Sequence, residues 1–369
     1  MTGRIDSPSD SSINFATSLK SLVSRRKPKM AALHGADPIT ELITIYNELN
    51  SHIIIELDEE PSPLEFMRFV AKNTPFVVRG AAADWKATRT WTSGFLKSHL
   101  ADETVNVAVT PAGNADAPTT YKDGSLVFAK PWEEDQPFPD FLDYVIRQEK
   151  RETENSEEIR YAQTQNDNLR NEYASLFSHV QQDIPFARIA LEQESPDAIN
   201  LWIGNSHSVT ALHKDNYENL YVQVLGQKHF VLLPPHCQPC VNEQALRPAQ
   251  YHRTQPREQN DDALELRLDV NDVNDDSGGN GAVPFATWDP DRPLENATAY
   301  SHLAEPVRVT LWPGDMLYLP CMWYHKVSQS CSPDDICVAV NYWYDMDFAG
   351  PLYPLSNFVR AANASSHNK

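Results

Sequence analysis

Two histidines and one aspartate have the residue types and spacing that could hold a catalytic metal. His213 and Asp215 are separated only by Lys214. On a β-strand, residues two apart point to the same side, so this imidazole and this carboxylate would converge while Lys214 pointed away. His325 offers a third ligand, in a later strand-rich stretch that follows a sharp turn at 313–315. Two histidines and one carboxylate leave open positions on the metal, as in non-haem Fe(II) oxygenases.

A lysine in the same region could bind the anionic end of a co-substrate. Lys228 lies 15 positions after His213 and beyond the next turn. It could therefore stand beside the metal, where a buried ammonium group needs an anion. A His-x-Asp triplet alone is weak evidence, because an incidental histidine on a surface strand is the common alternative. The residues around the triplet have to decide between the two.

Short strands separated by turn residues must position these side chains. From about residue 200 onward, apolar and β-branched stretches alternate with Gly, Asn and Pro, which is typical of a barrel or sandwich. The predicted strands are 201–203, 208–213, 220–225, 230–233, 307–311, 316–319 and 336–344. We therefore predict a mainly β fold with helical decoration.

The first half of the chain predicts helices and strands that support this barrel. Asp37-Pro38 and Ser62-Pro63 each combine an N-cap residue with proline at the first helical position, which marks a helix start. A further helix is expected over 138–147, and strands over 75–79 and 104–110. The helix after Ser62 would turn three apolar side chains inward, namely Leu64, Met67 and Val70.

One large domain with tails is the expected organisation. Residues 1–36 are rich in Ser, Arg and Lys and are predicted to be disordered. The domain would span 37–358. Within it, 37–199 would form an α/β segment that supports the barrel, and 200–350 would form the barrel core. An acidic inserted loop is expected at 255–281 and a C-terminal tail at 359–369.

The sequence around the triplet resembles a known family. The blocks HKDNYENLY, GQKHF, PGDMLYLPCMWYHKVSQS and VAVNYWYDMDF, with FVVRGAAADW and VNVAVTPAGNADA earlier in the chain, are similar to the jumonji C (JmjC) dioxygenases of the cupin superfamily. The similarity extends over roughly residues 40–350. It implies a double-stranded β-helix (cupin, jelly-roll) fold in which His213, Asp215 and His325 bind Fe(II), with 2-oxoglutarate and O2 as co-substrates.

The same resemblance assigns further pocket residues. Lys228 would bind the distal carboxylate of 2-oxoglutarate together with Thr210. The metal-side carboxylate would lie near Asn219 and Asn341. Tyr221 and Trp343 would line the pocket. The chain departs from the family pattern at Asn114, where a related sequence has a tyrosine that helps to hold the co-substrate; Tyr121 or another group would have to replace it.

The resemblance is strongest to lysyl hydroxylases, which implies hydroxylation of a lysine on a basic, soluble protein. GTP-binding proteins of the developmentally regulated class are the first candidates. Glu218, Asp345 and Asp347 lie close to the motif strands and would face the substrate. A histone N-methyl-lysine demethylase with the same iron chemistry is the alternative, and a non-catalytic cupin module is the third reading. A homodimer stays open at this point.

Charge and cysteine content restrict the partners and the compartment. The chain carries -20 overall, and because residues 1–30 hold six basic and two acidic side chains, residues 31–369 carry -24. Such a surface repels phosphate, which argues against direct nucleic-acid binding and favours basic proteins. Five cysteines in 369 residues do not form a disulfide framework. We expect a cytoplasmic or nuclear protein with no membrane span.

Other candidate ligands are set aside. His207 is too far along its strand from His213 to share a metal, and His229 must face away from its neighbour Lys228. The Cys237-x-x-Cys240 pair has no second pair at zinc-site spacing. An acidic stretch at 272–283 resembles a calcium loop, but its glycine is one place late and its twelfth position is Val283.

Overall fold

The structure is a computed structural model that describes residues 37–150, 158–254, 264–269 and 281–366. It divides into a unit that ends at Ser51 and a unit that begins at His52, so the second unit starts later than the predicted boundary at 37. The first unit contains helix α1 (Pro38–Leu49), where the Asp37 carboxylate accepts hydrogen bonds from the backbone N–H groups of Ile39 and Thr40. This helix start was predicted. Some predictions concern residues outside the described ranges. These are the disorder of 1–36, the positive charge of the N-terminal segment and most of the calcium-like stretch.

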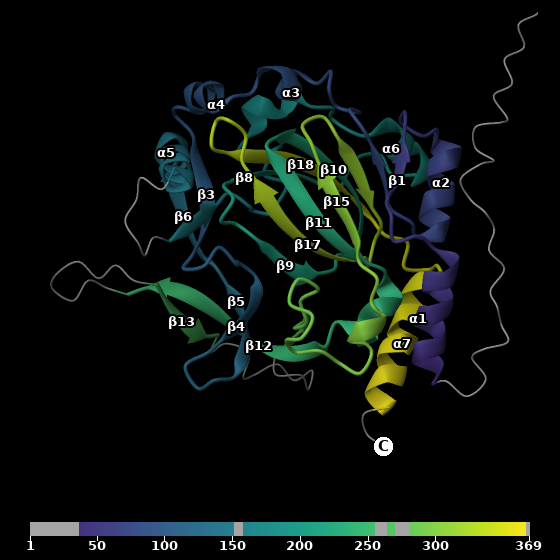
Figure 1. Cartoon of the computed structure of the whole chain (residues 1–369). Coiled ribbons are helices and arrows are strands. Elements are labelled where there is room, and N and C mark those ends of the chain that lie inside the picture. The colour runs from purple at the N-terminus through teal and green to yellow at the C-terminus, as the bar shows by residue number, and fades with distance from the viewer. Residues whose placement is uncertain (1–36, 151–157, 255–263, 270–280, 367–369) are drawn as a thin grey trace, which may run out of the picture. The chain divides into compact units, whose positions relative to one another are not determined.

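Two facing sheets form the centre of the second unit (Figure 1). The larger has the strand order β1-β2-β16-β10-β18-β8 and the smaller has the order β15-β11-β17-β9. Apart from the parallel β1–β2 pair, neighbouring strands in both sheets are antiparallel. The larger sheet consists of β1 (Ile55–Leu57), β2 (Phe76–Val78), β8 (Ala198–Gly204), β10 (Tyr217–Leu225), β16 (Met316–Leu319) and β18 (Cys337–Asp345). The smaller consists of β9 (Thr210–His213), β11 (Gln227–Leu233), β15 (Val307–Leu311) and β17 (Tyr324–Ser330).

The larger sheet is buried on both faces. Leu220 and Val222 of β10 pack with helices on the outer face, whereas Tyr221 of the same strand packs with Phe230 of β11 between the two sheets. Successive side chains on a strand point to opposite faces, so one strand serves both layers. The result is the predicted jelly-roll β fold, with its site-forming residues on the inner faces.

Helices and two smaller sheets surround these strands. The helices are α2 (Pro63–Lys72), α3 (Lys86–Thr90), α4 (Ser93–His99), α5 (Phe138–Glu149), α6 (Pro185–Ala190) and α7 (Leu352–Ser366), with short 3-10 helices η1 (Ala174–His179), η2 (Pro235–Cys240) and η4 (Ser301–Leu303). One small sheet joins β3 (Thr104–Thr110) to β6 (Trp132–Pro137) and β7 (Ile159–Tyr161). In the part of the chain that is described, no helix is long and apolar enough to cross a membrane.

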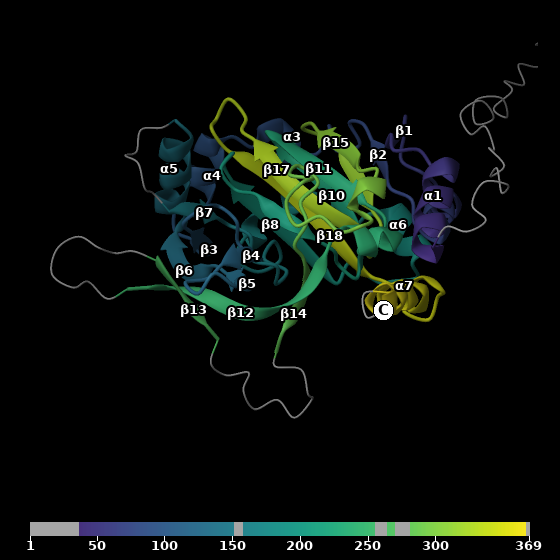
Figure 2. The ribbon, with the colours of Figure 1, turned by 60° about the horizontal axis from the view of Figure 1, so that its bottom comes forward.

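A second small sheet is built on one long strand, β12 (Glu243–Arg253). Figure 2 shows β12 with β13 (Leu264–Leu268) near one end and β14 (Val283–Ala286) near the other. The remaining strands of this sheet are β4 (Ala117–Thr120) and β5 (Leu126–Lys130), which pair with each other antiparallel, while β5 pairs with β12 in parallel.

Most predicted elements are present, and three expectations need correction. The barrel strands, the helices after Ser62 and over 138–147, and the strands at 75–79 and 104–110 all appear with shifts of a few residues. The predicted loop at 255–281 contains β13, because residues 264–268 continue the hairpin of β12. The predicted tail at 359–369 continues α7 as far as Ser366, and Arg360 ties this helix to Glu243. Strand β17, which carries His325, was not predicted.

Helix α2 buries a different face from the predicted one. Leu64 and Met67 are 63% and 51% exposed, whereas Phe66 is fully buried. The Phe66 ring packs edge-on against Phe186 and Tyr318 at 5.1 and 4.7 Å between centroids. An aromatic ring buries more surface than a leucine or methionine side chain, so its partners in the core determine the orientation of this short helix.

A tight backbone contact fixes the start of β9, the strand that leads to His213. Gly113 has φ +71°, and a Cβ atom there would lie 2.1 Å from the carbonyl oxygen of His207. The Gly113 carbonyl also accepts a hydrogen bond from the Val209 N–H at 2.8 Å. No side chain fits at this position, so glycine is required both by the backbone angle and by the contact.

We expect Gly113→Ala to destabilise the fold more than Gly124→Ala. Gly124 also has positive φ (+84°) but has nothing within 4 Å of an added Cβ, so its variant reports the cost of the left-handed backbone alone, about 1–2 kcal/mol. The clash at Gly113 should add about 1–3 kcal/mol. Urea unfolding of both variants measures the difference, and equal midpoints would show that the contact with His207 is not rigid.

Candidate metal centre

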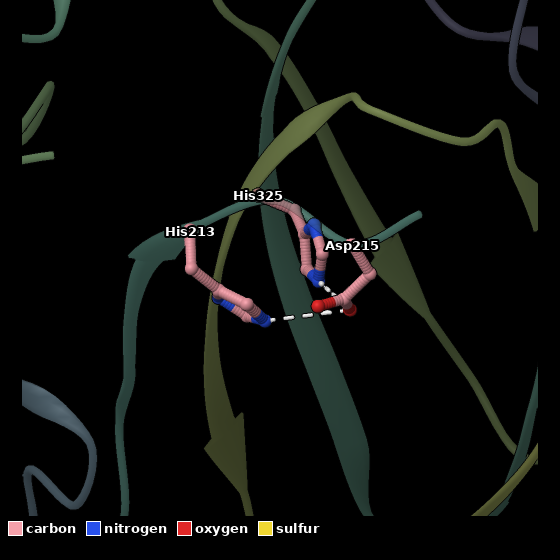
Figure 3. A group of neighbouring side chains, drawn as sticks. All are labelled: His213, Asp215 and His325. Carbon is pink, nitrogen blue, oxygen red and sulfur yellow. Dashed lines mark ion pairs between the residues drawn. The ribbon is translucent and has the colours of Figure 1, made fainter. Parts of the chain in front are cut away.

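The predicted ligands come together at one end of the smaller sheet. His213 is the last residue of β9 and lies directly opposite His325 of β17 in the strand pairing. The Nε2 atoms of both histidines lie 3.6 Å from Oδ2 of Asp215, and the three side chains face one another (Figure 3). One ligand atom from each residue falls within 4.8 Å of the others. Among the described residues this is the only such group of three.

Asp215 reaches this position from beyond the strand, which corrects the argument that placed His213 and Asp215 on one strand face. β9 ends at His213, and Asp215 lies in the connection to β10. Its backbone carbonyl accepts a hydrogen bond of 2.7 Å from the Met322 N–H. The connection is thereby tied to the segment just before β17, so the carboxylate returns to the two imidazoles without strand geometry.

Backbone carbonyls orient both imidazole rings. Nδ1 of His213 lies 2.8 Å from the carbonyl oxygen of Ala211, and Nδ1 of His325 lies 3.0 Å from that of Trp323. A carbonyl only accepts, so each Nδ1 carries the proton and donates it. Each Nε2 then presents its lone pair toward Asp215, which is the tautomer that a metal ligand requires.

The local electrostatics favour the protonation states of metal ligands. Burial alone would raise the pKa of Asp215, but attraction to the neighbouring His213 lowers it to about 2. Burial, reinforced by repulsion from His213, lowers the pKa of His325 to about 4. Burial would likewise lower the pKa of His213, but the charge of Asp215 outweighs it and raises this pKa. At neutral pH Asp215 is ionised and His325 is neutral, which are the forms that bind a metal ion.

This donor set fits the iron that the sequence predicted. Two imidazole nitrogens and one carboxylate oxygen on one face suit Fe(II) with open positions for a co-substrate. Oxygen-only sites suit magnesium or calcium, and thiolate sites suit zinc. Cys237 and Cys240 are buried, free thiols on η2 and are not part of the group.

A small inner cavity extends from the three ligands to Lys228. Lys228 is only 3% exposed, and its Nζ donates a hydrogen bond of 2.7 Å to the hydroxyl of Tyr161. Burial raises the pKa of Tyr161, so its phenol stays neutral. None of the described carboxylates is within ion-pair distance of this ammonium group. A buried cation without an anion is poorly stabilised, so the cavity suits one carboxylate of a ligand such as 2-oxoglutarate.

Five more residues that the sequence analysis named line this cavity: Thr210, Asn219, Tyr221, Asn341 and Trp343. Asn341 donates to the side-chain oxygen of Asn219 at 3.2 Å and accepts from the Trp202 indole at 2.8 Å. Trp343 stacks on Tyr217, with ring centroids 4.6 Å apart. These contacts hold the wall on the larger sheet in one arrangement beside the metal ligands.

Other expected residues lie elsewhere. Glu218 points to the opposite face of β10 from Asn219, where it accepts hydrogen bonds from the Tyr318 hydroxyl (2.6 Å) and the Cys321 N–H (3.2 Å). Adjacent strand residues face opposite ways, so Glu218 cannot line the pocket. Asp345 and Asp347 are exposed beyond the cavity walls.

The two other histidines that were weighed as ligands behave as expected. Both ring nitrogens of His229 are engaged, with the hydroxyls of Thr310 and Ser330, and His207 lies outside both cavities. Lys214 does not: it was expected to point away from His213 and Asp215, but it lines a cavity with both of them, and its Nζ lies 4.0 Å from Glu243.

Tyr161 was not predicted to belong to the site, although its hydroxyl accepts the hydrogen bond of Lys228. Tyr121 follows β4 at the hairpin turn and lines neither cavity. Tyr161 is the last residue of β7. The next residue, Ala162, forms an isolated β-bridge with Ile203 of β8. The three-residue strand is too short to show a periodic pattern, and only its proximity to β8 in the folded chain brings it to Lys228.

A larger outer cavity of about 460 Å³ opens on His213 and Asp215. Its walls come from distant parts of the chain: the turn before β4, strands β5 and β14, and helix α7. It shares Trp202, Thr210 and Gln165 with the inner cavity. A substrate side chain therefore has a path to the metal ligands that does not cross the inner cavity.

Comparisons with known proteins agree with this geometry. Residues 61–350 match the family described as cupin-like domain. The human bifunctional peptidase and (3S)-lysyl hydroxylase JMJD7 is 35% identical over 79% of this chain and 84% of its own length. The lysine-specific demethylase JMJ32 of Arabidopsis thaliana is 36% identical over 84% of this chain and 86% of its own. The JmjC domain-containing protein E of Dictyostelium discoideum is 32% identical over 83% and 88%.

Removal of any one metal ligand should abolish metal binding and leave the fold intact. We expect His213→Ala, Asp215→Ala and His325→Ala each to lower Fe(II) affinity by more than ~100-fold, because three protein donors are the minimum for this labile ion. Anaerobic metal titration with circular dichroism measures both properties. His207→Ala, which removes an exposed imidazole outside the site, is the control. Normal iron content in any triad variant would contradict the assignment.

Lys228→Ala should raise the 2-oxoglutarate concentration needed for turnover. Loss of the ammonium partner of a carboxylate in a desolvated site costs about 3–5 kcal/mol, more than ~100-fold in affinity. Lys326→Ala is the matched control, because Lys326 lies on β17 with its side chain paired to Asp289 and Asp291. If 2-oxoglutarate affinity is unchanged in Lys228→Ala, another cation such as Lys214 binds the co-substrate.

Proposed function

Because this chain belongs to the cupin-like JmjC family of Fe(II)- and 2-oxoglutarate-dependent oxygenases, we propose that it is a protein hydroxylase that acts on lysine. The relative from human is named a (3S)-lysyl hydroxylase, and the relative from Arabidopsis thaliana is named a lysine-specific demethylase. Both names refer to lysine. The two named reactions differ in the C–H bond that is oxidised, which belongs to the lysine side chain in hydroxylation and to an N-methyl group in demethylation.

The observation that carries the proposal is the outer cavity beside the metal ligands. It holds about 460 Å³ and is lined by aromatic rings, by the carboxylates of Asp116 and Glu243, and by Lys214 and Arg360, which pair with Glu243. The chain around it carries -24 over residues 31–369. A long, cationic side chain from a basic protein is the ligand that suits this combination of depth and charge.

The residues of the site have separate tasks in this reaction. The bound iron and 2-oxoglutarate supply the oxidation of a C–H bond by O2, with 2-oxoglutarate converted to succinate and CO2. His213, Asp215 and His325 hold the metal ion, and Lys228 with Tyr161 binds the distal carboxylate of the co-substrate. Trp202 and Trp343 line the inner cavity and would limit the access of water to the bound co-substrate.

Demethylation of a methylated lysine is the second candidate. Phe128, Phe285 and Tyr324 line the outer cavity, and aromatic rings also suit a methylated ammonium group. Hydroxylation is favoured because a free ammonium group needs hydrogen-bond acceptors, which the two carboxylates provide. A purely binding cupin has no need for the complete donor set together with the buried Lys228.

The proposed partner is a basic protein with an accessible lysine, of which GTP-binding proteins of the developmentally regulated class are the first candidates by family resemblance. The described cysteines are all free, which supports a reducing compartment, cytosol or nucleus. The acidic charge argues against a nucleic acid as the direct substrate.

Matched peptides decide between hydroxylase and demethylase. Peptides from those GTP-binding proteins, with the target lysine either unmodified or trimethylated, are incubated with the iron-loaded protein and 2-oxoglutarate. We expect one oxygen atom to be added to the unmodified peptide by mass spectrometry, without release of formaldehyde from either peptide. The Asp215→Ala variant is the inactive control. Formaldehyde from the trimethylated peptide, with no oxygen added to the unmodified one, would replace hydroxylation by demethylation.

A further inference from the structure

The outer cavity contains three carboxylates, and two of them already have cationic or metal-binding partners. Asp215 faces the two imidazoles of the metal centre. Glu243 lies 2.9 Å from Nε of Arg360 and 4.0 Å from Nζ of Lys214, and it also accepts from the Tyr324 hydroxyl at 3.2 Å. Its charge is neutralised within the protein. The third carboxylate, Asp116, differs from both.

Asp116 has no ion pair with any described lysine or arginine. Its side-chain hydrogen bond comes from the neutral amide of Gln163, whose Nε2 donates to Oδ2 at 3.2 Å. The charges of His213 and Lys130 reach it, but His213 belongs to the metal centre and the Lys130 ammonium group is paired with Asp269 at 2.8 Å. Glu133 adds a second negative charge nearby, and burial together with Glu133 raises the pKa of Asp116. A partly buried carboxylate in this environment is stabilised by any cation that enters the cavity.

Asp116 belongs to the wall of the cavity that contains His213 and Asp215. The residue lies at the end of the connection between β3 and β4, with φ +52°. Left-handed backbone at a residue other than glycine costs free energy and persists where the surroundings require it. Asp116 lines the same cavity as His213 and Asp215, and its charge acts on the His213 imidazole. A group bound to Asp116 therefore lies beside the metal ligands.

We propose that Asp116 binds the side-chain ammonium of the substrate lysine and so determines the specificity of the enzyme for unmodified lysine. This deepens the proposed function and rests on it. An ammonium group donates charge-assisted hydrogen bonds to the carboxylate, and Gln163 holds the carboxylate in place. The hydrocarbon part of the side chain then extends across the metal centre. A trimethylated lysine has no N–H to donate, and a neutral side chain has no charge to pair.

The variant Asp116→Asn isolates this role. Asparagine is readily accepted at positive φ, and its side-chain oxygen can still accept from Gln163, so only the charge changes. The control Asp102→Asn removes a charge from an exposed turn before β3. The probes are the unmodified lysine peptide described above and the same peptide with norleucine, which keeps the hydrocarbon chain and lacks the ammonium group.

Two measurements are made on each protein. The first is the KM and kcat for hydroxylation of each peptide. The second is calorimetric binding of each peptide to protein loaded with Mn(II) and N-oxalylglycine, a non-reactive analogue of 2-oxoglutarate. We expect Asp116→Asn to weaken binding of the lysine peptide at least about tenfold, because one charged hydrogen bond is lost. In Asp116→Asn we expect no change in binding of the norleucine peptide, in the KM for 2-oxoglutarate or in metal content. In Asp102→Asn we expect all of these quantities, and binding of the lysine peptide, to stay as in the unaltered protein.

The outcomes separate this proposal from the proposed function. An unchanged preference for lysine over norleucine in Asp116→Asn overturns the role of Asp116, even if hydroxylation proceeds. Equal binding of both peptides by the unaltered protein overturns it as well. If the unaltered protein binds lysine in preference to norleucine, depends on Asp116 for this, and yet adds no oxygen, the hydroxylase proposal fails while the role of Asp116 stands.

Discussion

The pairing of β9 with β17 is the constraint on which the site depends. It sets His213 directly opposite His325 in the ladder, with ring centroids 4.1 Å apart. The carbonyls of Ala211, in β9, and of Trp323, just before β17, orient the rings of His213 and His325. Two of the three donors are therefore positioned by main-chain hydrogen bonds and not by flexible side-chain contacts. A site organised in this way needs little rearrangement when a metal ion binds.

The family resemblance named the residues of the inner cavity, and alternation along the strands explains why they share one face. Because Lys228 faces inward on β11, every second residue of that strand does so too. Asn219 and Tyr221 are likewise two residues apart on β10, and Asn341 and Trp343 are two apart on β18, so each pair faces the inner cavity. Glu218 was misplaced because this rule was not applied to it. Its negative charge close to the motif strands had suggested a contact with a basic substrate, whereas its neighbour Asn219 already occupied the inner face.

Contacts between segments that are distant in the chain were not predictable in the same way. Tyr161 belongs to a strand of three residues, and its relation to Lys228 arises only when β7 lies beside β8. Asp116 stands in an irregular connection, where no period indicates which way a side chain points. Helix α2 shows the same limit, because the partners of Phe66 come from α6 and β16. Local patterns predicted the elements, and tertiary packing selected the faces.

Helix α7 has a consequence for how this enzyme can diversify. Tyr353, Asn357 and Arg360 of this helix form part of the outer cavity wall, yet they lie after residue 350, where the match to the cupin-like family ends. The metal ligands and Lys228 all lie on barrel strands or their connections. Substitutions in the C-terminal helix can thus reshape the entrance without disturbing the iron-binding ladder. One part of the wall that a substrate would meet is thus encoded apart from the metal ligands, and natural selection can alter it while conserving them.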